Sequence, residues 1–146
     1  MKFIAHRGNT QGKNLDQENK IDYLRYASSQ GHGVEFDVQC YNDTLYLGHN
    51  EPQEKLSLEL LRLPHAFIHA KDIESLEKLL KLNCNVFWHQ SDKLTITNLG
   101  FIWCYPGVFV NSTQAVWLDL HDFKLPNTIS NIYGICGDKI NEKHFA

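Results

Sequence analysis

Short apolar runs separated by polar segments organise the first 90 residues of the chain. Residues 2–5 form the first run, and in residues 34–39 Val34, Phe36 and Val38 alternate with acidic or amide side chains. Alternation with a period of two is typical of a β-strand, so residues 34–38 predict a strand whose acidic side chains share one face. Residues 66–71 and 86–89 predict two further strands.

Helical spacing appears between the first two predicted strands. Ile21, Leu24 and Ala27 recur at intervals of three and fall on one face of a helix. The glycines of residues 31–33 are predicted to end this helix, and Asp16 is its candidate N-cap. A helix of this kind connects two strands that run in the same direction.

The next segments repeat the alternation. Asn42 and Asp43 predict a tight turn, after which residues 45–48 form a short strand. Residues 57–63 predict a short helix, and Asp72 is placed to cap another. The apolar stripe of that last helix consists of Ile73, Leu76, Leu79 and Leu80.

Helical periodicity fades after about residue 90. Residues 101–104, 108–110, 115–118 and 132–136 predict strands joined by loops. Strands that alternate with helices are typical of an α/β fold with parallel strands and right-handed crossovers. No internal repeat, low-complexity tract or linker appears, so residues 1–146 are predicted to form one domain.

Composition narrows the functional classes. The net charge of −3 provides no basic field of the kind that binds nucleic acid. No stretch approaches the roughly 18 consecutive apolar residues of a membrane span, and the polar His6 follows too few apolar positions for a signal-peptide core. The four cysteines lack C-x-x-C spacing and are interpreted as reduced. We therefore expect a cytoplasmic protein without an integral membrane segment and without a nucleic-acid partner.

Charged and imidazole side chains gather where the first predicted strands end. His6 and Arg7 follow the first strand, Glu35 and Asp37 lie in the second, and His49 follows the short strand after the turn. Cleavage of a phosphodiester needs an acid, a base, a cation for the phosphate and acidic ligands for a divalent metal. The pattern therefore predicts a phosphodiester-cleaving site.

Glu35 and Asp37 stand two residues apart on one predicted strand, so their side chains point the same way. Two such carboxylates can ligate one hard cation together. The alternative is a solvated sheet face. Val34, Phe36 and Val38 account for one covered face only, whereas a parallel strand is normally covered on both, which favours the metal site.

The order of these motifs resembles the glycerophosphodiester phosphodiesterase family. Its superfamily also includes the spider sphingomyelinases D and the phosphatidylinositol-specific phospholipases C. The resemblance covers residues 4–49 and rests on His6-Arg7-Gly8, Glu18-Asn19, Glu35-Phe36-Asp37-Val38-Gln39 and the turn before His49. Residues 133–138, Tyr-Gly-Ile-Cys-Gly-Asp, are similar to the segment that closes the last strand of the family's barrel.

The resemblance implies a TIM-type (β/α)8 barrel. Such barrels typically have about 250 residues and seldom fewer than about 200. Eight strands of about five residues, each with a crossover of about a dozen, need about 136 residues. We therefore expect a small barrel with shortened or missing helices in its second half. An incomplete barrel, or one completed in a homo-oligomer, is the alternative.

The resemblance also implies roles for individual residues. His6 and His49 correspond to the catalytic acid–base pair, Arg7 to a phosphate-binding cation, and Glu35 and Asp37 to metal ligands. Lys71 matches the lysine of the family's third strand and is a candidate substrate-binding residue, and Glu18 is a candidate for substrate binding or for ordering the loop around the site. Apart from the resemblance, His89, Trp88 and Trp117 are candidate pocket residues, and the alternative for the tryptophans is that they pack in the core. In the Glu18-Asn19 motif, Gln17 and Lys20 replace the proline and threonine of the family.

His69 is the main departure from the family. Many members have an acidic metal ligand two residues before the lysine, where this chain has His69. Imidazole suits Mn²⁺ or Zn²⁺ better than the hard cations. The expected cofactor is therefore Mg²⁺ or Ca²⁺ on Glu35 and Asp37, with His69 as a third ligand that would also allow Mn²⁺ or Zn²⁺.

Two functions follow from the sequence. The first is a metal-dependent phosphoric diester hydrolase that acts on a glycerophosphodiester or a related phospholipid headgroup. The second is a catalytically silent relative that binds a phosphorylated ligand or a partner protein. His6 and His49 favour the enzyme, because binding alone would require only the cations. The short chain and His69 favour the binding protein.

Overall fold

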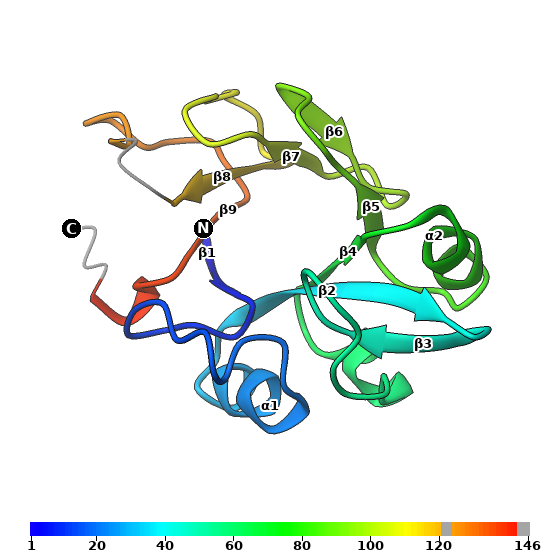
Figure 1. Cartoon of the computed structure of the whole chain (residues 1–146). Helices are drawn as coiled ribbons and strands as arrows, with labels where there is room; N and C mark the ends of the chain where they lie inside the picture. Colours follow the sequence, from blue (N-terminus) through cyan, green and yellow to red (C-terminus); the bar gives the residue numbers. More distant parts are fainter. Residues whose placement is uncertain (121–123, 143–146) are drawn as a thin grey trace.

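The computed structural model describes residues 1–120 and 124–142 (Figure 1). The strands in these ranges are β1 Lys2–His6, β2 Gly33–Tyr41, β3 Thr44–Leu47, β4 Ala66–Ala70, β5 Val86–Trp88, β6 Leu94–Ile96, β7 Ile102–Cys104, β8 Ala115–Asp119 and β9 Gly134–Gly137. The α-helices there are α1 Ile21–Ser29 and α2 Ile73–Leu80, and two short 3-10 helices are η1 Leu58–Arg62 and η2 Ile140–Glu142.

Eight of the strands form one curved sheet in the order β5-β4-β2-β1-β9-β8-β7-β6. β3 pairs only with β2, and β5 and β6 stand at the two ends of the path. The other strands that are consecutive in the chain are paired, and the last strand β9 pairs with the first. The sheet therefore curls into a nearly closed barrel, which Figure 1 shows end-on. All neighbours along this path are parallel except β6 and β7.

The barrel is least regular between β5 and β6, the two ends of the path. Side chains take the place of a strand ladder there. Asn98 Oδ1 accepts from Val86 N at 2.9 Å while Asn98 N donates to the Val86 carbonyl at 3.1 Å, and Thr95 Oγ1 donates to the Trp88 carbonyl at 3.0 Å. One chain thus almost closes the ring by itself.

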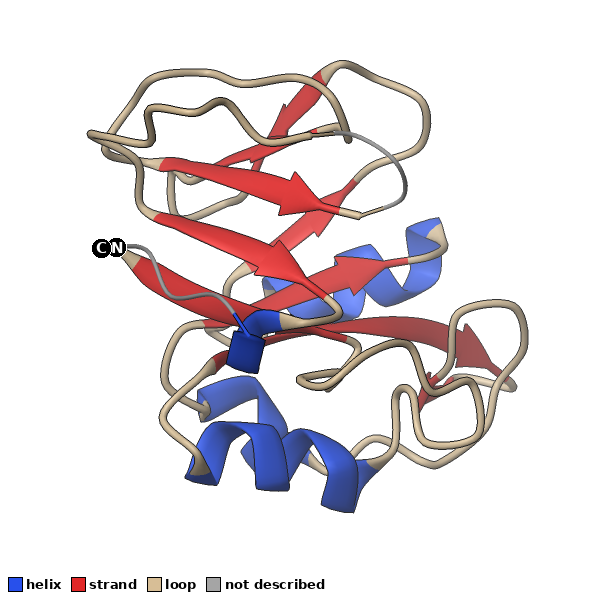
Figure 2. Cartoon of the chain, turned by 90° about the vertical axis from the view of Figure 1, so that its left-hand side faces the viewer, coloured by secondary structure: helices blue, strands red, loops and turns tan. Residues whose placement is uncertain are grey.

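The two halves of the barrel are covered differently. Helices α1 and α2 and η1 pack on the outer face of the first half (Figure 2). Val34, Phe36 and Val38 of β2 point outward into the core beneath these helices. Loops cover the outer face of the second half, where Trp117 of β8 packs on Phe109 and donates to the Val110 carbonyl. The expectation of few helices in the second half is confirmed for the described residues.

The antiparallel β6 is the clearest difference from a regular (β/α)8 barrel. Residues 97–101 are all that separate β6 from β7. A parallel crossover needs about a dozen residues, so a connection of this length can only make a hairpin. The α/β barrel prediction is therefore confirmed at the level of a small, mostly parallel barrel-shaped sheet.

Aromatic rings fill the interior of the barrel. Phe67 of β4 lies 5.2 Å from Phe101, 5.4 Å from Trp103 and 5.9 Å from Tyr133, measured between ring centroids. Phe87 stacks on Trp103 at 4.6 Å. This aromatic column closes the barrel as a packed core and supports the polar residues at one end of it.

Several local predictions differ from the structure. Helix α1 begins at Ile21 with Lys20 at the N-cap position, so Asp16 as the N-cap is wrong. Where an α-helix was predicted over residues 57–63, Leu58–Arg62 form the 3-10 helix η1, and residues 108–110 are loop rather than strand. Strand β6 is absent from the sequence prediction, because its three residues are too short to show a period.

Asp72 caps α2 as expected. Its side chain accepts from Ser75 N at 2.7 Å, and the Ser75 hydroxyl lies 3.4 Å from Asp72 N, which completes a capping box. Within the described residues, no helix combines the length and the apolar character needed to cross a membrane.

Candidate active site

Strand register brings the predicted residues to one end of the barrel. His6 is opposite Glu35 where β1 pairs with β2, and Asp37 is opposite His69 where β2 pairs with β4. Side chains two apart on a strand share a face, so Glu35 and Asp37 both point into the barrel while their neighbours point outward. The carboxyl ends of the strands thus hold the polar cluster, as in other barrels that carry active sites.

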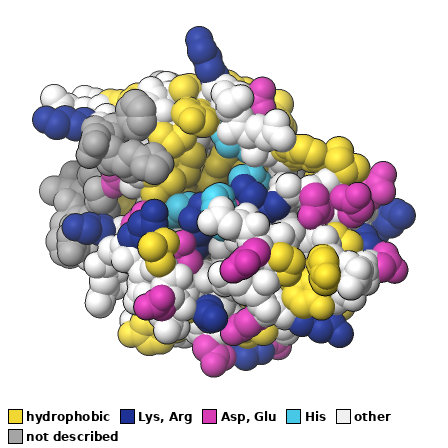
Figure 3. All heavy atoms as spheres, viewed as in Figure 1, with side chains coloured by type: hydrophobic (Ala, Val, Ile, Leu, Met, Phe, Trp, Pro, Cys, Tyr) yellow, Lys and Arg dark blue, Asp and Glu magenta, His cyan; other side chains and the backbone are white. Residues whose placement is uncertain are grey.

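The cluster lines a small cleft of about 120 Å³. In Figure 3 histidine side chains lie near the middle of this face, beside basic side chains and below hydrophobic ones. One wall is polar and the other is apolar. The lining consists of His6, Arg7, Glu35, Asp37, His49, His69, His89, Trp103, Tyr105, Pro106, Leu118 and Leu120.

Glu35, Asp37 and His69 form a group that could hold a metal ion. One donor atom from each lies within 4.8 Å of the others. His69 Nε2 lies 2.9 Å from the His89 carbonyl, which can only accept, so Nε2 carries the proton and Nδ1 of the neutral ring carries a lone pair. That lone pair is 3.2 Å from Asp37 Oδ1, a buried oxygen without a hydrogen-bond donor among the described residues.

Two acceptors at that distance repel each other unless a proton or a cation lies between them. The donor set of two carboxylates and one imidazole therefore fits a divalent metal. It suits Mn²⁺ or Zn²⁺ through the imidazole and Mg²⁺ or Ca²⁺ through the oxygens.

The pKa values of the two carboxylates are shifted in opposite directions. Burial and the nearby charge of Asp37 raise the pKa of Glu35. Burial would also raise the pKa of Asp37, but the hydrogen bonds that His49 and His69 donate when their rings are protonated, together with the charge of Arg7, outweigh it and hold that pKa well below its usual value. Asp37 is therefore the fixed negative charge of the site, and Glu35 is the carboxylate that gains most from a bound cation.

Arg7 is tied to protein groups. Its Nε lies 3.0 Å from Asp37 Oδ2, one terminal nitrogen 3.2 Å from Glu18 Oε2 and the other 2.9 Å from His49 Nδ1. Arg7 also has a left-handed backbone (φ 54°), which is uncommon for a residue with a side chain. The expected phosphate fork is thus largely occupied, and the guanidinium mainly positions the carboxylates and His49.

The Glu18-Asn19 motif orders the loop around the cluster. Glu18 accepts from Arg7 and, at 3.0 Å, from Asn9 Nδ2. Asn19 Nδ2 donates to Asp37 Oδ2 at 2.9 Å, and its Oδ1 accepts from Asp37 N at 2.9 Å. The Asn19 side chain therefore hydrogen-bonds to both the backbone and the carboxylate of Asp37.

His6 is oriented by Asp138, a residue that the sequence did not indicate as part of the site. Asp138 Oδ1 lies 2.8 Å from His6 Nδ1, and Asn9 Nδ2 donates to the same oxygen at 2.9 Å. Because the carboxylate accepts, His6 keeps its proton on Nδ1, and Nε2 faces Glu35 Oε2 at 3.9 Å. Burial alone lowers the pKa of His6, but the bond to Asp138 and the charge of Glu35 raise it above its usual value.

The pairing of β1 with β9 explains this contact. Ala5 is opposite Gly137, so the next residues, His6 and Asp138, lie side by side. The sequence signal for this contact is the similarity of residues 133–138 to the last strand of the family's barrel, but that similarity assigns no role to Asp138.

His49 lies on the other side of the cluster. Gly48 (φ 149°) makes the turn before it, and a Cβ atom there would collide with the Glu51 carbonyl. His49 Nδ1 is 2.9 Å from Arg7 and 3.3 Å from Asp37 Oδ2. It accepts from Arg7 when unprotonated and donates to Asp37 when protonated, so the ring has a partner in both states.

The remaining candidates are placed as follows. His89 lines the cleft, and both of its buried ring nitrogens lack a hydrogen-bond partner among the described residues. Burial and His69 lower the pKa of His89. Lys71 follows β4 and is not a lining residue, and neither Trp88 nor Trp117 contributes to the wall, which instead contains Trp103.

Comparison of the chain with protein-family models, curated proteins and solved structures gives no significant match. The functional proposal therefore rests on the residues of the site and their geometry.

Replacement of Asp138 by asparagine is expected to lower the pKa of His6. The hydrogen bond to a negative carboxylate favours imidazolium, and an amide in the same place supplies no charge. The measurement is an NMR titration of the histidine ring protons in the metal-free protein. Asp22→Asn, at a fully exposed position on α1, is the matched control. An unchanged His6 titration would show that Asp138 does not set its protonation.

Proposed function

We propose that the protein is a metal-dependent phosphodiesterase related to the glycerophosphodiester phosphodiesterases, with a compact barrel of the same kind. The observation that carries the proposal is the placement of the two histidines. His6 Nε2 approaches Glu35 and His49 Nδ1 approaches Asp37, and both carboxylates belong to one candidate metal cluster. An acid and a base thus flank the position where a phosphate would be held.

The two histidines have complementary roles in this proposal. His6 Nε2 is unprotonated in the neutral ring, so it can take the proton of an attacking hydroxyl or water as that oxygen bonds to phosphorus. The bond from phosphorus to the leaving oxygen breaks, and His49 gives that oxygen its proton. Asp138 holds His6 in the required tautomer, as the third group of such relays does.

Glu35, Asp37 and His69 would hold the divalent metal. When bound, it would neutralise charge on the phosphate oxygens. Arg7 keeps Asp37 ionised and His49 in place, and His89 lines the cleft beside them. A substrate hydroxyl next to the phosphorus can act as the nucleophile and give a cyclic phosphate.

A screen for turnover tests this function. We expect bis-p-nitrophenyl phosphate or glycerophosphocholine to be hydrolysed in the presence of Mg²⁺, Mn²⁺ or Ca²⁺, and EDTA to abolish the reaction. Zn²⁺ belongs in the same screen because of His69. Absence of turnover with every metal and diester would favour the silent relative that binds a phosphorylated ligand or partner.

A further inference from the structure

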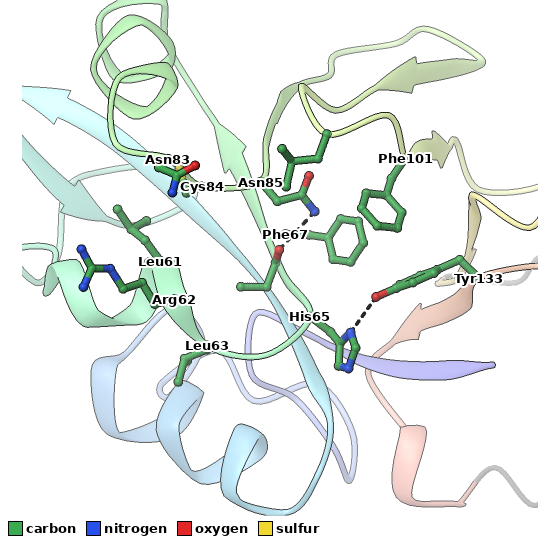
Figure 4. A pocket seen from close by; sticks show the side chains of 12 residues that line it. Leu61, Arg62, Leu63, His65, Phe67, Asn83, Cys84, Asn85, Phe101 and Tyr133 are labelled. Carbon is green, nitrogen blue, oxygen red and sulfur yellow. Dashed lines mark hydrogen bonds between the residues drawn. The ribbon is translucent and has the colours of Figure 1, made fainter.

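A second cavity lies at the opposite end of the barrel from the candidate active site (Figure 4). Its volume is about 280 Å³, and it is lined by segments that precede β4, β5, β7 and β9. Residues that precede parallel strands lie at the amino-terminal end of a barrel, whereas the metal cluster lies at the carboxyl end. The interior of the barrel separates the two cavities.

Three aromatic rings form one wall of this cavity. Phe101 and Tyr133 meet at 65° with their centroids 4.6 Å apart, and Phe67 meets Phe101 at 75° and 5.2 Å. Rings in this edge-to-face geometry offer both faces and edges to a further ring. In Figure 4 Phe67, Phe101 and Tyr133 lie together on one side of the cavity.

Asn85 places an unpaired acceptor beside these rings. Its Nδ2 donates to the Ala66 carbonyl at 3.2 Å, which fixes the orientation of the amide. Asn85 is 9% exposed, and its Oδ1 is buried without a donor among the described residues. In Figure 4 the amide lies next to Phe67 and Phe101. An unpaired buried acceptor is destabilising, so a ligand donor that reached it would be bound favourably.

His65 and Tyr133 close the rim without adding charge. His65 Nδ1 lies 2.6 Å from the Tyr133 hydroxyl. Burial and the charge of Lys2 lower the pKa of His65, so the imidazole is neutral at physiological pH. Among the described residues that line the cavity, Arg62 is the one with a charged side chain, and its guanidinium extends away from the rings in Figure 4.

We propose that this cavity binds a small, neutral, aromatic molecule that carries one N–H or O–H donor. Its ring would lie against the partly exposed Phe101 and Tyr133, which Phe67 supports from the core, and its donor would bond to Asn85 Oδ1. The aromatic wall selects a planar apolar body, and the unpaired acceptor selects a donor. The Arg62 guanidinium extends away from the rings in Figure 4, so a neutral molecule fits them. The site is independent of the proposed phosphodiesterase activity.

Indole and benzothiophene form a matched pair of probes, because they have nearly the same shape and only indole has an N–H. Calorimetric titration of the full chain is expected to show saturable binding of indole and about tenfold weaker binding of benzothiophene. Amide shifts in a ¹H–¹⁵N spectrum should gather around residues 65–67, 85 and 133. The proposal is overturned by equal affinities, by lack of saturable binding, or by shifts located elsewhere.

Two variants separate the donor from the wall. Asn85→Leu is similar in volume but removes the acceptor, so it should make the affinities for indole and benzothiophene equal. Phe101→Ala should weaken both ligands by about tenfold or more. Leu58→Ala, at an exposed leucine on η1, is the control and should bind like the parent. If Asn85→Leu fails to fold, the probe pair and Phe101→Ala still decide the question.

Discussion

Replacement of either His6 or His49 by alanine is expected to lower phosphodiester turnover by about 10²- to 10⁴-fold, the usual contribution of a positioned acid or base. Binding of the metal should persist, because Glu35, Asp37 and His69 are retained. The double variant should be much less impaired than the product of the two single effects, since the histidines serve one proton relay. Steady-state kinetics on the single and double variants provide the measurement.

The pH dependence supplies a second test of the same pair. One histidine must be neutral and the other charged, so the rate should rise and fall between about pH 5 and pH 9. His32→Ala is a suitable control, because His32 precedes β2 at the other end of the barrel and bonds to Asn141. Single variants with near-parental rates would show that His6 and His49 are structural, and the phosphodiesterase proposal would fail.

Replacement of Glu35 by glutamine is expected to weaken metal binding by at least about 100-fold. Removal of a residue that only hydrogen-bonds to a metal ligand already lowers metal affinity by about 10–100-fold. Glu35 is a proposed direct ligand, so its loss should have a larger effect. Calorimetric titration with Mn²⁺ and Mg²⁺ measures the change. Glu51→Gln, at an exposed position shortly after His49, is the matched control. Full affinity in Glu35→Gln would place the metal elsewhere.

The same variant should raise the melting temperature of the metal-free protein. Glu35 has a raised pKa in the folded state, so its ionised form opposes folding above the usual pKa of a glutamate, and this effect disappears as the pH falls below that value. Each kcal/mol regained corresponds to about 2–4 °C in a domain of this size. Calorimetric melting at pH 7 checks the sign.

Asp37→Asn should have the opposite effect on stability. The lowered pKa of Asp37 means that its ionised form supports the fold above the usual pKa of an aspartate, and this support is lost as the pH falls through the lowered value. In the Asp37→Asn variant Arg7 loses a buried counter-charge, and breaking a buried ion pair typically lowers the free energy of unfolding by about 3–5 kcal/mol. Destabilisation of the metal-free protein by Glu35→Gln would contradict this division of roles.

The sequence determined the local elements that have a strong period. The alternation of Val34, Phe36 and Val38 with acidic residues predicted β2 and the shared face of Glu35 and Asp37, because side chains of a strand alternate regardless of context. Asp72 predicted the start of α2, since a capping carboxylate acts over a few residues only. Chain length predicted the scarcity of helices in the second half.

Contacts between distant segments were decided only by the tertiary structure. Asp138 meets His6 across 132 residues through the β1–β9 register, and Trp103 rather than Trp117 faces the cleft, because strand direction and register fix which side of the sheet a side chain occupies. Arg7, the predicted phosphate-binding cation, contacts Glu18, Asp37 and His49, and no sequence pattern indicated these three partners. A residue type indicates what a side chain can bind, but only the fold determines which partners lie within reach of it.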